Sequence, residues 1–524
     1  MVALRSVIFW VLAVVTSTQA ANILGLYSSY SPSHLIIHMS AAKALAEAGH
    51  NVTVVSMMEP KVTHKDIHVI VVPLEKEKLL ILENQMVTMA GKKNSMISTF
   101  HRILNDMDVM IDSQADILSD PRFLRIFDTK FDLMILGAFL NDFQLGVAAQ
   151  LKVPVIVDWM TAPNFITDGF TGNPSELSYV PNVATFTTHP MSFLKRAENL
   201  AKHLLMAYMS TLLDSKLTGI YKKFYGAENG QPTLNELRKN ISMVFVGSHL
   251  VSEGPIRPLV PAIVETGGIQ VKDKPDPLPK DIDEFLSKST QGAVFLSLGS
   301  NIKSSTVNPE IVQTIFKVLS GLKLNVIWKW EDLENTPGNA SNILYKTWLP
   351  QDDILAHRNT KLFITHAGKG GITESQYHGV PMVALPIFAD QPGNAEIMKN
   401  SGYGVALNLL TITEESLSKA IKEVLENEKY SQAVGKFSAL YRDRPLTAKQ
   451  SVVFWTEYVL RHHGAPHLQS PAVHMSFIER NNLDIYTLLI TIVVLFVFLT
   501  RLVAKFVWSK ILGKANISTA KKKQ

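Results

Sequence analysis

Two histidines in this sequence follow predicted buried strands, at positions where a side chain can do chemistry. His34 lies in the stretch YSSYSPSHLIIHMS, shortly after the apolar run 22–27. A histidine at the carboxyl end of a strand can act as a general base near neutral pH. His38 lies one helical turn further on and is the local alternative for that role.

The second histidine, His366, opens the stretch HAGKGG after the apolar run 362–365. Gly368 and Gly370 allow the backbone to approach a ligand closely, and free N–H groups at the start of the following helix favour a phosphate. Ser300 adds a hydroxyl after the first strand of the same region. The glycine pattern is neither a dinucleotide fingerprint nor a P-loop, so alone it is equally compatible with a tight turn.

Further side chains near this turn suit the parts of a nucleotide sugar. Trp348 offers an aromatic face on which a base can stack. Glu374 lies about two helical turns after the histidine, where its carboxylate can accept hydrogen bonds from a ribose. Asp390 and Gln391 follow the apolar run 381–389 and pair a carboxylate with an amide. Base, ribose, diphosphate and hexose each gain a partner, which predicts a nucleotide sugar as the ligand.

These motifs, in this order, resemble the donor-binding signature of the UDP-glycosyltransferases. The chain is similar to the membrane-bound animal branch of that family, and to its invertebrate-type members, from about residue 22 to 508. The segments that carry the resemblance are WLPQ at 348–351, HAGKGGITE at 366–374, HGVPM at 378–382 and FADQP at 388–392.

The resemblance implies a role for individual residues. Trp348 stacks on uracil, Gln351 contacts the uridine and Glu374 binds the ribose. His366 and Ser300 reach the phosphates beside the glycine turn, while the hexose is bound by Asp390 and Gln391. His34 is the general base, and neither a cofactor nor a metal ion is required.

The sequence departs from the family pattern in two places. Ala367 stands where a second glycine is usual, and Lys369-Gly370 replaces the usual asparagine-containing pair. Gly137 occupies the position of the aspartate that usually orients the catalytic histidine. Asp142, five residues later, is the acid that we expect could take its place. The alternative is a non-catalytic membrane protein that binds a nucleotide sugar or a lipophile.

Strand and helix patterns alternate twice along the chain, which predicts two doubly wound parallel sheets. Together with the resemblance, this gives an α/β chain with the GT-B fold, two Rossmann-like domains facing a cleft. An amphipathic stretch at 191–226 is interpreted as core-facing, with a membrane-leaning face as the alternative. The predicted segments are a signal peptide at 1–20, an acceptor-binding domain at 21–271, a linker at 272–289, a UDP-sugar-binding domain at 290–447, a closing helix and juxtamembrane segment at 448–483, a transmembrane helix at 484–508 and a basic cytosolic tail at 509–524.

The two ends of the chain indicate the compartment. The apolar run 7–15 with small residues before position 20 is typical of a signal peptide. The span at 484–508 is followed by lysines, so its C-terminal side is expected to be cytoplasmic. The tail resembles a dilysine retrieval signal. We therefore expect a single-pass type I protein of the endoplasmic-reticulum membrane with a lumenal body, and its sequon at Asn339 is the best glycosylation candidate.

Charge and composition exclude other classes of protein. Residues 501–524 contain seven Lys or Arg and no acid, so the remainder of the chain carries about −2 of the net +5. Nothing indicates nucleic-acid binding, and the absence of cysteine excludes thiolate chemistry.

We predict inverting transfer of a hexose, with UDP-glucose favoured over UDP-glucuronate, to a small lipophilic acceptor, in a protein that is compatible with homo-oligomerisation.

Overall fold

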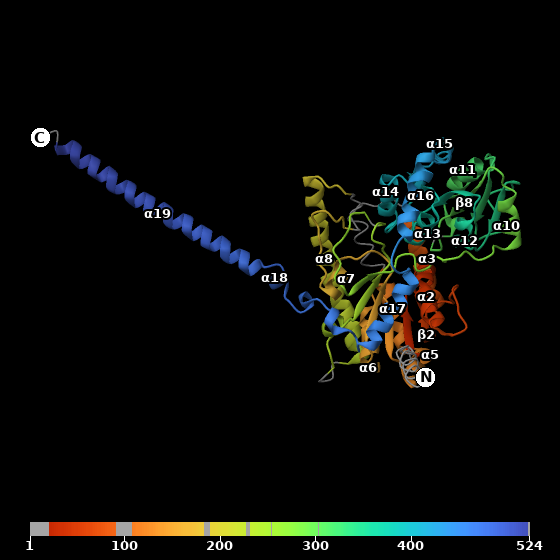
Figure 1. The fold of residues 1–524 in the computed structure, drawn as a ribbon, viewed down its shortest axis with the longest axis horizontal. Coiled ribbons are helices and arrows are strands. Elements are labelled where there is room, and N and C mark those ends of the chain that lie inside the picture. The colour runs from red at the N-terminus through yellow and green to blue at the C-terminus, as the bar shows by residue number, and fades with distance from the viewer. Residues whose placement is uncertain are drawn as a thin grey trace, which may run out of the picture. The chain divides into compact units, whose positions relative to one another are not determined.

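The computed structural model describes residues 20–90, 107–182, 189–226, 231–252, 254–301 and 303–521. These residues belong to two compact units, one within Met1–Gln469 and the other within Ser470–Gln524. The predicted signal peptide lies outside the described residues, apart from its last position. Figure 1 colours the chain from red at the N-terminus to blue at the C-terminus.

The first half of the larger unit is built on a parallel seven-stranded sheet with the order β3-β2-β1-β4-β5-β6-β7. We call this sheet and its helices the N-terminal lobe. The apolar runs predicted five of the strands to within about two residues, but β6 and β7 were not predicted. The strands are β1 (Asn22–Tyr27), β2 (Asn51–Ser56), β3 (Ile67–Val71), β4 (Leu133–Gly137), β5 (Val155–Trp159), β6 (Met243–Val246) and β7 (Ile263–Glu265).

The second half carries a parallel six-stranded sheet with the order β10-β9-β8-β11-β12-β13. This sheet and its helices form the C-terminal lobe. Its strands are β8 (Ala293–Ser297), β9 (Asn325–Lys329), β10 (Ile343–Lys346), β11 (Thr360–Thr365), β12 (Met382–Ala384) and β13 (Gly404–Ala406). Two parallel sheets confirm the predicted α/β class.

Helices cover both faces of each sheet, which is why the strands are continuously apolar. Along β1, Leu24 and Leu26 point into one core while Ile23 and Tyr27 point into another. The N-terminal lobe contains α2 (Pro32–Glu47), α3 (Lys76–Ala90), α5 (Pro121–Leu124), α6 (Leu145–Leu151), α7 (Phe165–Thr171), α8 (Phe193–Tyr225) and α9 (Leu234–Lys239). The rest of the larger unit contains α10 (Lys280–Ser287), α11 (Pro309–Ser320), α12 (Gln351–Ala356), α13 (Lys369–His378), α14 (Gln391–Asn400), α15 (Glu414–Glu426), α16 (Glu428–Arg442) and α17 (Ala448–Arg461).

The chain returns to the N-terminal lobe at its closing helix, α17. Ala448, Val452 and Val459 on this helix join the same core as Met39 and Leu45 on α2. A capping box starts α17 at Thr447, whose hydroxyl accepts from the N–H of Gln450. The closing role predicted for this segment therefore places it against the lobe that carries His34.

One predicted segment contains an additional helix, and one expectation for local structure was wrong. The linker predicted at 272–289 contains helix α10, because Ile282 and Leu286 lie one turn apart and are buried among charged neighbours. On α8, the apolar side chains expected to face the core are instead exposed, while the buried positions of that helix lie mainly further along. The exposed residues are Phe193, Leu194, Leu200, Leu204 and Leu205.

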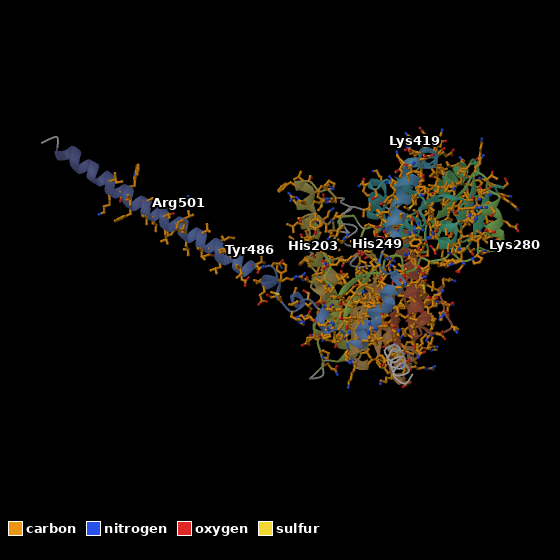
Figure 2. All side chains as sticks on the ribbon, in the orientation of Figure 1. His203, His249, Lys280, Lys419, Tyr486 and Arg501 are labelled. Carbon is orange, nitrogen blue, oxygen red and sulfur yellow. The ribbon has the colours of Figure 1, made fainter. Side chains whose placement is uncertain are left out.

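The second unit consists of α18 (Phe477–Arg480) and the long helix α19 (Leu483–Lys521). Within α19, Leu483–Ile511 is long and apolar enough to cross a membrane. Its apolar side chains are exposed, and Figure 2 marks Tyr486 and Arg501 along it.

Candidate active site

The turn after β11 has the form that the sequence predicted. The strand ends at Thr365, and α13 begins at Lys369 with Gly368 as its N-cap residue. The first N–H groups of α13 have no partner within the helix and point toward the carboxyl edge of the sheet. Such a helix start favours a negatively charged ligand.

Two glycines make the space in which the ring of His366 lies. A Cβ atom on Gly299 would lie 2.6 Å from Cε1 of His366, and one on Gly368 would lie 2.3 Å from Nε2. Gly299 also has a φ of +88°, a backbone conformation that residues other than glycine rarely adopt. Burial, and secondarily the charge of Lys329, lower the pKa of His366 to about 4. The ring is therefore neutral at pH 7 and can donate a hydrogen bond without carrying charge.

Replacing Gly299 with alanine is expected to displace this ring. The added methyl group meets His366 and strains the backbone, so we expect at least about 2 kcal/mol of destabilisation and weaker UDP binding. Thermal unfolding and UDP titration measure the two effects. Gly169→Ala is the matched control, because nothing lies within 4 Å of its Cβ position. Equal behaviour of the two variants would contradict this account of His366.

The departure at Ala367 has a measurable backbone consequence. Its φ is +63°, in the left-handed region that the family's usual glycine adopts more easily. The conformation costs an alanine about 1–2 kcal/mol. Its methyl group is fully buried, which returns about 0.8 kcal/mol. The second term offsets part of the first and leaves a net cost of about 0.2–1.2 kcal/mol, which a chain of this size tolerates.

Gln351 and Glu374 are brought together from neighbouring helices. Nε2 of Gln351 donates to Oε2 of Glu374 at 2.6 Å. Burial raises the pKa of Glu374 to about 8, and the negative charge of Asp352 acts in the same direction. The carboxyl group is thus held largely protonated at neutral pH, an effect that sequence reasoning did not foresee.

The Asp390-Gln391 pair lies at the start of α14. Oε1 of Gln391 accepts from the N–H groups of Ile387 and Phe388, at 2.9 and 3.0 Å, so its amide nitrogen is the group that it can offer a ligand. Oδ2 of Asp390 accepts from Nδ2 of Asn394 at 2.6 Å. Asn394 also donates to the carbonyl of the turn at position 367. This asparagine ties the sugar-binding pair to the glycine turn and was missed from the sequence.

Lys369 is a further cation beside this pair. Burial lowers its pKa to about 8, although the carboxylate of Asp390 opposes that shift. Burial raises the pKa of Asp390 in turn. The two groups therefore lie close together. We expected that Lys369 could compensate electrostatically for the asparagine that the family carries here, and that role stays a prediction.

Trp348 lies between β10 and α12, and 44% of its surface is exposed. Nζ of Lys61, from the N-terminal lobe, lies 5.6 Å from the centre of the ring. The aromatic face is thus accessible to a cation and, by the same geometry, to a flat base. Ser300 lies in the loop after β8, partly buried.

Two contacts bring the loops of the two lobes together at this edge. Oγ of Ser31 donates to Oδ1 of Asn301 at 3.0 Å. Nε2 of Gln270 donates to the carbonyl of Gly370 at 3.4 Å. The loop that precedes His34 therefore meets the loop that contains Ser300.

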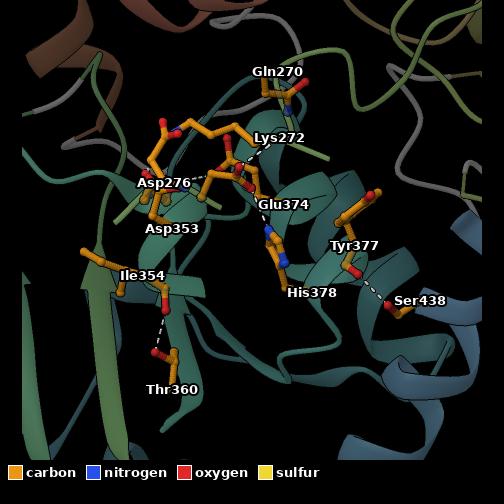
Figure 3. Close-up of polar contacts among 12 residues, drawn as sticks. Gln270, Lys272, Asp276, Asp353, Ile354, Thr360, Glu374, Tyr377, His378 and Ser438 are labelled. Carbon is orange, nitrogen blue, oxygen red and sulfur yellow. Dashed lines mark hydrogen bonds and ion pairs between the residues drawn. The ribbon is translucent and has the colours of Figure 1, made fainter. Parts of the chain in front are cut away.

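The segment between the lobes is fastened to the donor-side helices, as Figure 3 shows. Nζ of Lys272 donates to Asp353 at 2.6 Å, and its backbone N–H donates to Asp352 at 2.9 Å. Nε2 of His378 lies 2.6 Å from the other oxygen of Asp352. Since Asp352 also raises the pKa of Glu374, the linker and the predicted ribose site share one charge network.

On the acceptor side, His34 lies in the first turn of α2, after β1 as predicted. Its Nδ1 is 2.9 Å from Oγ of Ser29, and its ring meets the edge of Phe139 at 5.3 Å between centroids. Burial, and secondarily the nearby His38, lower the pKa of His34 to about 3. A serine hydroxyl therefore occupies the place where an orienting carboxylate was expected.

The prediction that Asp142 orients His34 is not what the structure shows. Its carboxylate pairs with Arg238, which also binds Asp214. A buried guanidinium attracts a carboxylate more strongly than a neutral imidazole does. Asp142 therefore serves the packing of its own helix against α9.

The residue missed by sequence reasoning is Asp158, at the end of β5. Its partner across the sheet is Gly137, the position where the family's aspartate was expected. Oδ2 of Asp158 accepts from Nδ1 of His38 at 2.6 Å, and both side chains are buried. The predicted strand at 153–158 ended on this acid, which was the available signal. Asp158 is therefore the partner of His38 and not of His34.

Among the described residues, no three His, Asp or Glu side chains are grouped so that they could hold a metal ion. Independence from metal ions and cofactors stays a prediction.

Comparisons with known proteins identify the family of this chain. A family model described as "UDP-glucoronosyl and UDP-glucosyl transferase" matches residues 25–517. UDP-glucosyltransferase 2 of Dactylopius coccus is 32% identical over 508 residues, which cover 96% of each chain. Human UDP-glucuronosyltransferase 1A1 is 29% identical, covering 92% of this chain and 91% of that protein.

Solved structures show the same fold at low identity. The glycotransferase of kitacinnamycin superposes with a TM-score of 0.53 and 17% identity, over 85% of this chain and 100% of its own. Spinosyn forosaminyltransferase SpnP gives a TM-score of 0.53 and 14% identity, over 84% and 100%. These likenesses, together with the two parallel sheets, confirm the predicted GT-B fold. The family match over nearly its whole length shows that the chain belongs to the UDP-glucuronosyl and UDP-glucosyl transferase family. Its similarity to the Dactylopius protein fits the predicted invertebrate-type member.

Proposed function

We propose that this protein transfers a hexose from a UDP-sugar to a hydroxyl of a small lipophilic acceptor, with inversion and with His34 as the general base. The observation that carries the proposal is the hydrogen bond from Ser31 to Asn301. It joins the loop before His34 to the loop after β8. The proposed base on the first sheet and the proposed donor site on the second sheet therefore lie close to each other. Attack from the base side on an α-linked sugar gives a β-glycoside.

The donor is expected to lie along the carboxyl edge of the second sheet. The start of α13 and the neutral ring of His366 suit the diphosphate, because they donate hydrogen bonds to negative oxygens. We assign the ribose to the Gln351–Glu374 pair and the hexose hydroxyls to Asp390 with Gln391, and the hydrogen bonds that orient these side chains support the assignment.

UDP-glucose is favoured over UDP-glucuronate as the donor. Lys369 is a cation near the predicted hexose site, but the negative charge of Asp390 beside it weakens the attraction between Lys369 and the carboxylate of a glucuronate. Glucose needs only hydroxyl partners, which the pair at 390–391 supplies. The body is expected in the lumen of the endoplasmic reticulum, with the apolar stretch Leu483–Ile511 of α19 as its single membrane span, since the lysines at the end of the chain follow that stretch.

Trp348→Ala is expected to weaken UDP binding roughly 5- to 150-fold, because aromatic stacking on a base contributes about 1–3 kcal/mol. Titration of UDP against the purified full chain measures the loss. Trp348→Phe is the matched control and should retain most of the affinity, since it keeps an aromatic face. Equal UDP affinity in the alanine variant would remove Trp348 from the base site.

The test of the whole proposal is a transfer assay. Microsomes that contain the protein are incubated with UDP-glucose or UDP-glucuronate and a panel of phenols and alcohols, and glycosides are identified by mass. Product with UDP-glucose alone is the expected result, and product with UDP-glucuronate alone would reverse the sugar assignment. Silence with both donors, alongside protection from unfolding by UDP, would favour a binding-only protein.

A further inference from the structure

Three positions could have supplied a carboxylate to His34, and none does so. Position 137 is a glycine, Asp142 is paired with Arg238, and Asp158 is bound to His38. The hydrogen-bond partner of His34 is the hydroxyl of Ser29. This difference has a chemical consequence beyond the transfer reaction proposed above, on which the inference rests.

The glycine at position 137 is required by the second histidine. A Cβ atom there would lie 2.9 Å from Nε2 of His38 and 2.9 Å from the ring of Tyr27. That tyrosine stacks on His38 with 4.9 Å between centroids. The space of an orienting aspartate is thus filled by an imidazole, and the acid has its place on the neighbouring strand.

A serine cannot do what a carboxylate does for a catalytic imidazole. A carboxylate accepts only, so it fixes the proton on Nδ1 and leaves Nε2 free to take a proton. A hydroxyl can donate or accept, so both tautomers of His34 are allowed. A carboxylate also stabilises the imidazolium that forms, whereas Ser29 has no charge with which to do so.

We propose that the acceptors of this enzyme are acidic hydroxyl compounds, such as phenols with electron-withdrawing substituents, because His34 is held by Ser29 instead of a carboxylate. The low pKa of His34, about 3, agrees with a weak base in this position. Aliphatic alcohols need a stronger base and are poor acceptors here.

The reaction balances in either protonation state of the acceptor. The acceptor oxygen forms a bond to the anomeric carbon with its own electron pair, and the bond from that carbon to the phosphate oxygen breaks. The electron pair leaves with UDP. A neutral phenol gives its proton to His34, while a phenolate has no proton to give. An acidic acceptor therefore needs less help from a basic group of the enzyme.

The inference is tested with acceptors of similar size and different acidity. The full chain in microsomes is supplied with the active UDP-sugar and, separately, para-nitrophenol, phenol or benzyl alcohol. We expect kcat/KM to fall at least about 100-fold from para-nitrophenol to benzyl alcohol, since general base catalysis is worth roughly 10²–10⁴-fold. For phenol, kcat/KM should rise with pH as its ionised fraction grows. A benzyl alcohol rate within about threefold of the para-nitrophenol rate would overturn the inference.

A double variant separates basicity from pocket shape. His38→Asn with Gly137→Asp removes the imidazole that fills the place of an aspartate on β4, and the asparagine can still donate to Asp158. The ring of Tyr27, which also lies 2.9 Å from the added Cβ, must shift to admit the aspartate. In a variant that unfolds and binds UDP like the wild type, the rate ratio between para-nitrophenol and benzyl alcohol should shrink by at least about tenfold. An unchanged ratio would show that pocket shape, not the base, selects the acceptor. The wild-type series decides the question by itself if the variant does not fold.

The two proposals fail in different ways. If no acceptor in the series gives product while UDP still protects the chain from unfolding, the transfer function itself is rejected. If alcohols and acidic phenols react equally well, transfer stands and only the acceptor class is rejected.

Discussion

Replacing His34 with alanine is expected to lower kcat with phenol about 100-fold or more and to leave UDP affinity unchanged. General base catalysis contributes roughly 10²–10⁴-fold. The lower end is expected here, because Ser29 gives the imidazole no charge to stabilise its protonated form. UDP affinity should hold, since the donor residues lie in the C-terminal lobe.

Initial rates with saturating UDP-sugar, together with UDP titration, check this prediction. His68→Ala is the control, because His68 lies exposed on the outer strand β3. It should match the wild type in both measurements. Turnover that survives the loss of His34 would leave a different group, or the ionised acceptor alone, responsible for the proton.

The second large effect concerns Glu374, whose carboxyl group is buried with a pKa of about 8. The unfolded chain has an ordinary glutamate near 4.5, so the folded chain binds more protons between these values. Stability is therefore highest below about pH 4.5 with respect to this group and is lost as pH rises toward 8. Glu374→Gln removes the titration, and we expect the variant to be more stable than the wild type at pH 8 by several degrees in Tm.

Thermal unfolding from pH 5 to pH 8.5, without nucleotide, measures this difference. Glu415→Gln on the surface of α15 should follow the wild type at every pH, because that side chain is exposed. The same Glu374 variant should bind UDP more weakly, since a ribose hydroxyl loses its carboxylate partner. Parallel pH curves for wild type and Glu374→Gln would show that burial does not perturb this carboxyl group.

The architecture of the chain was largely readable from its apolar runs. Both sheets are parallel and covered on both faces, so each inner strand is a short apolar run bounded by polar turns. Two of the edge strands, β7 and β13, were missed because each is only three residues long, and the inner strand β6 was missed as well. Helix α10 was missed because its two buried residues stand among charges and prolines.

The predicted donor residues follow consecutive strands and helix starts, which is why they could be selected from the sequence. Gln351 and Glu374 are far apart in sequence, yet parallel strands bring their helices to one edge. The order of the motifs determined the family as well, and the match over residues 25–517 confirmed it. None of this needed a side-chain contact between distant segments to be known in advance.

What the sequence could not decide is which acid belongs to which histidine. His34 and His38 both lie shortly after the first predicted strand, and Asp142 follows a predicted strand while Asp158 ends the next one. Only the tertiary structure pairs Asp158 with His38 and Asp142 with Arg238, because the folded sheet and its helices bring these side chains within hydrogen-bond distance. The sequence determined the fold, the family and the order of the predicted donor residues, whereas the partner of each histidine was decided by the distances between side chains on α2, β4 and β5.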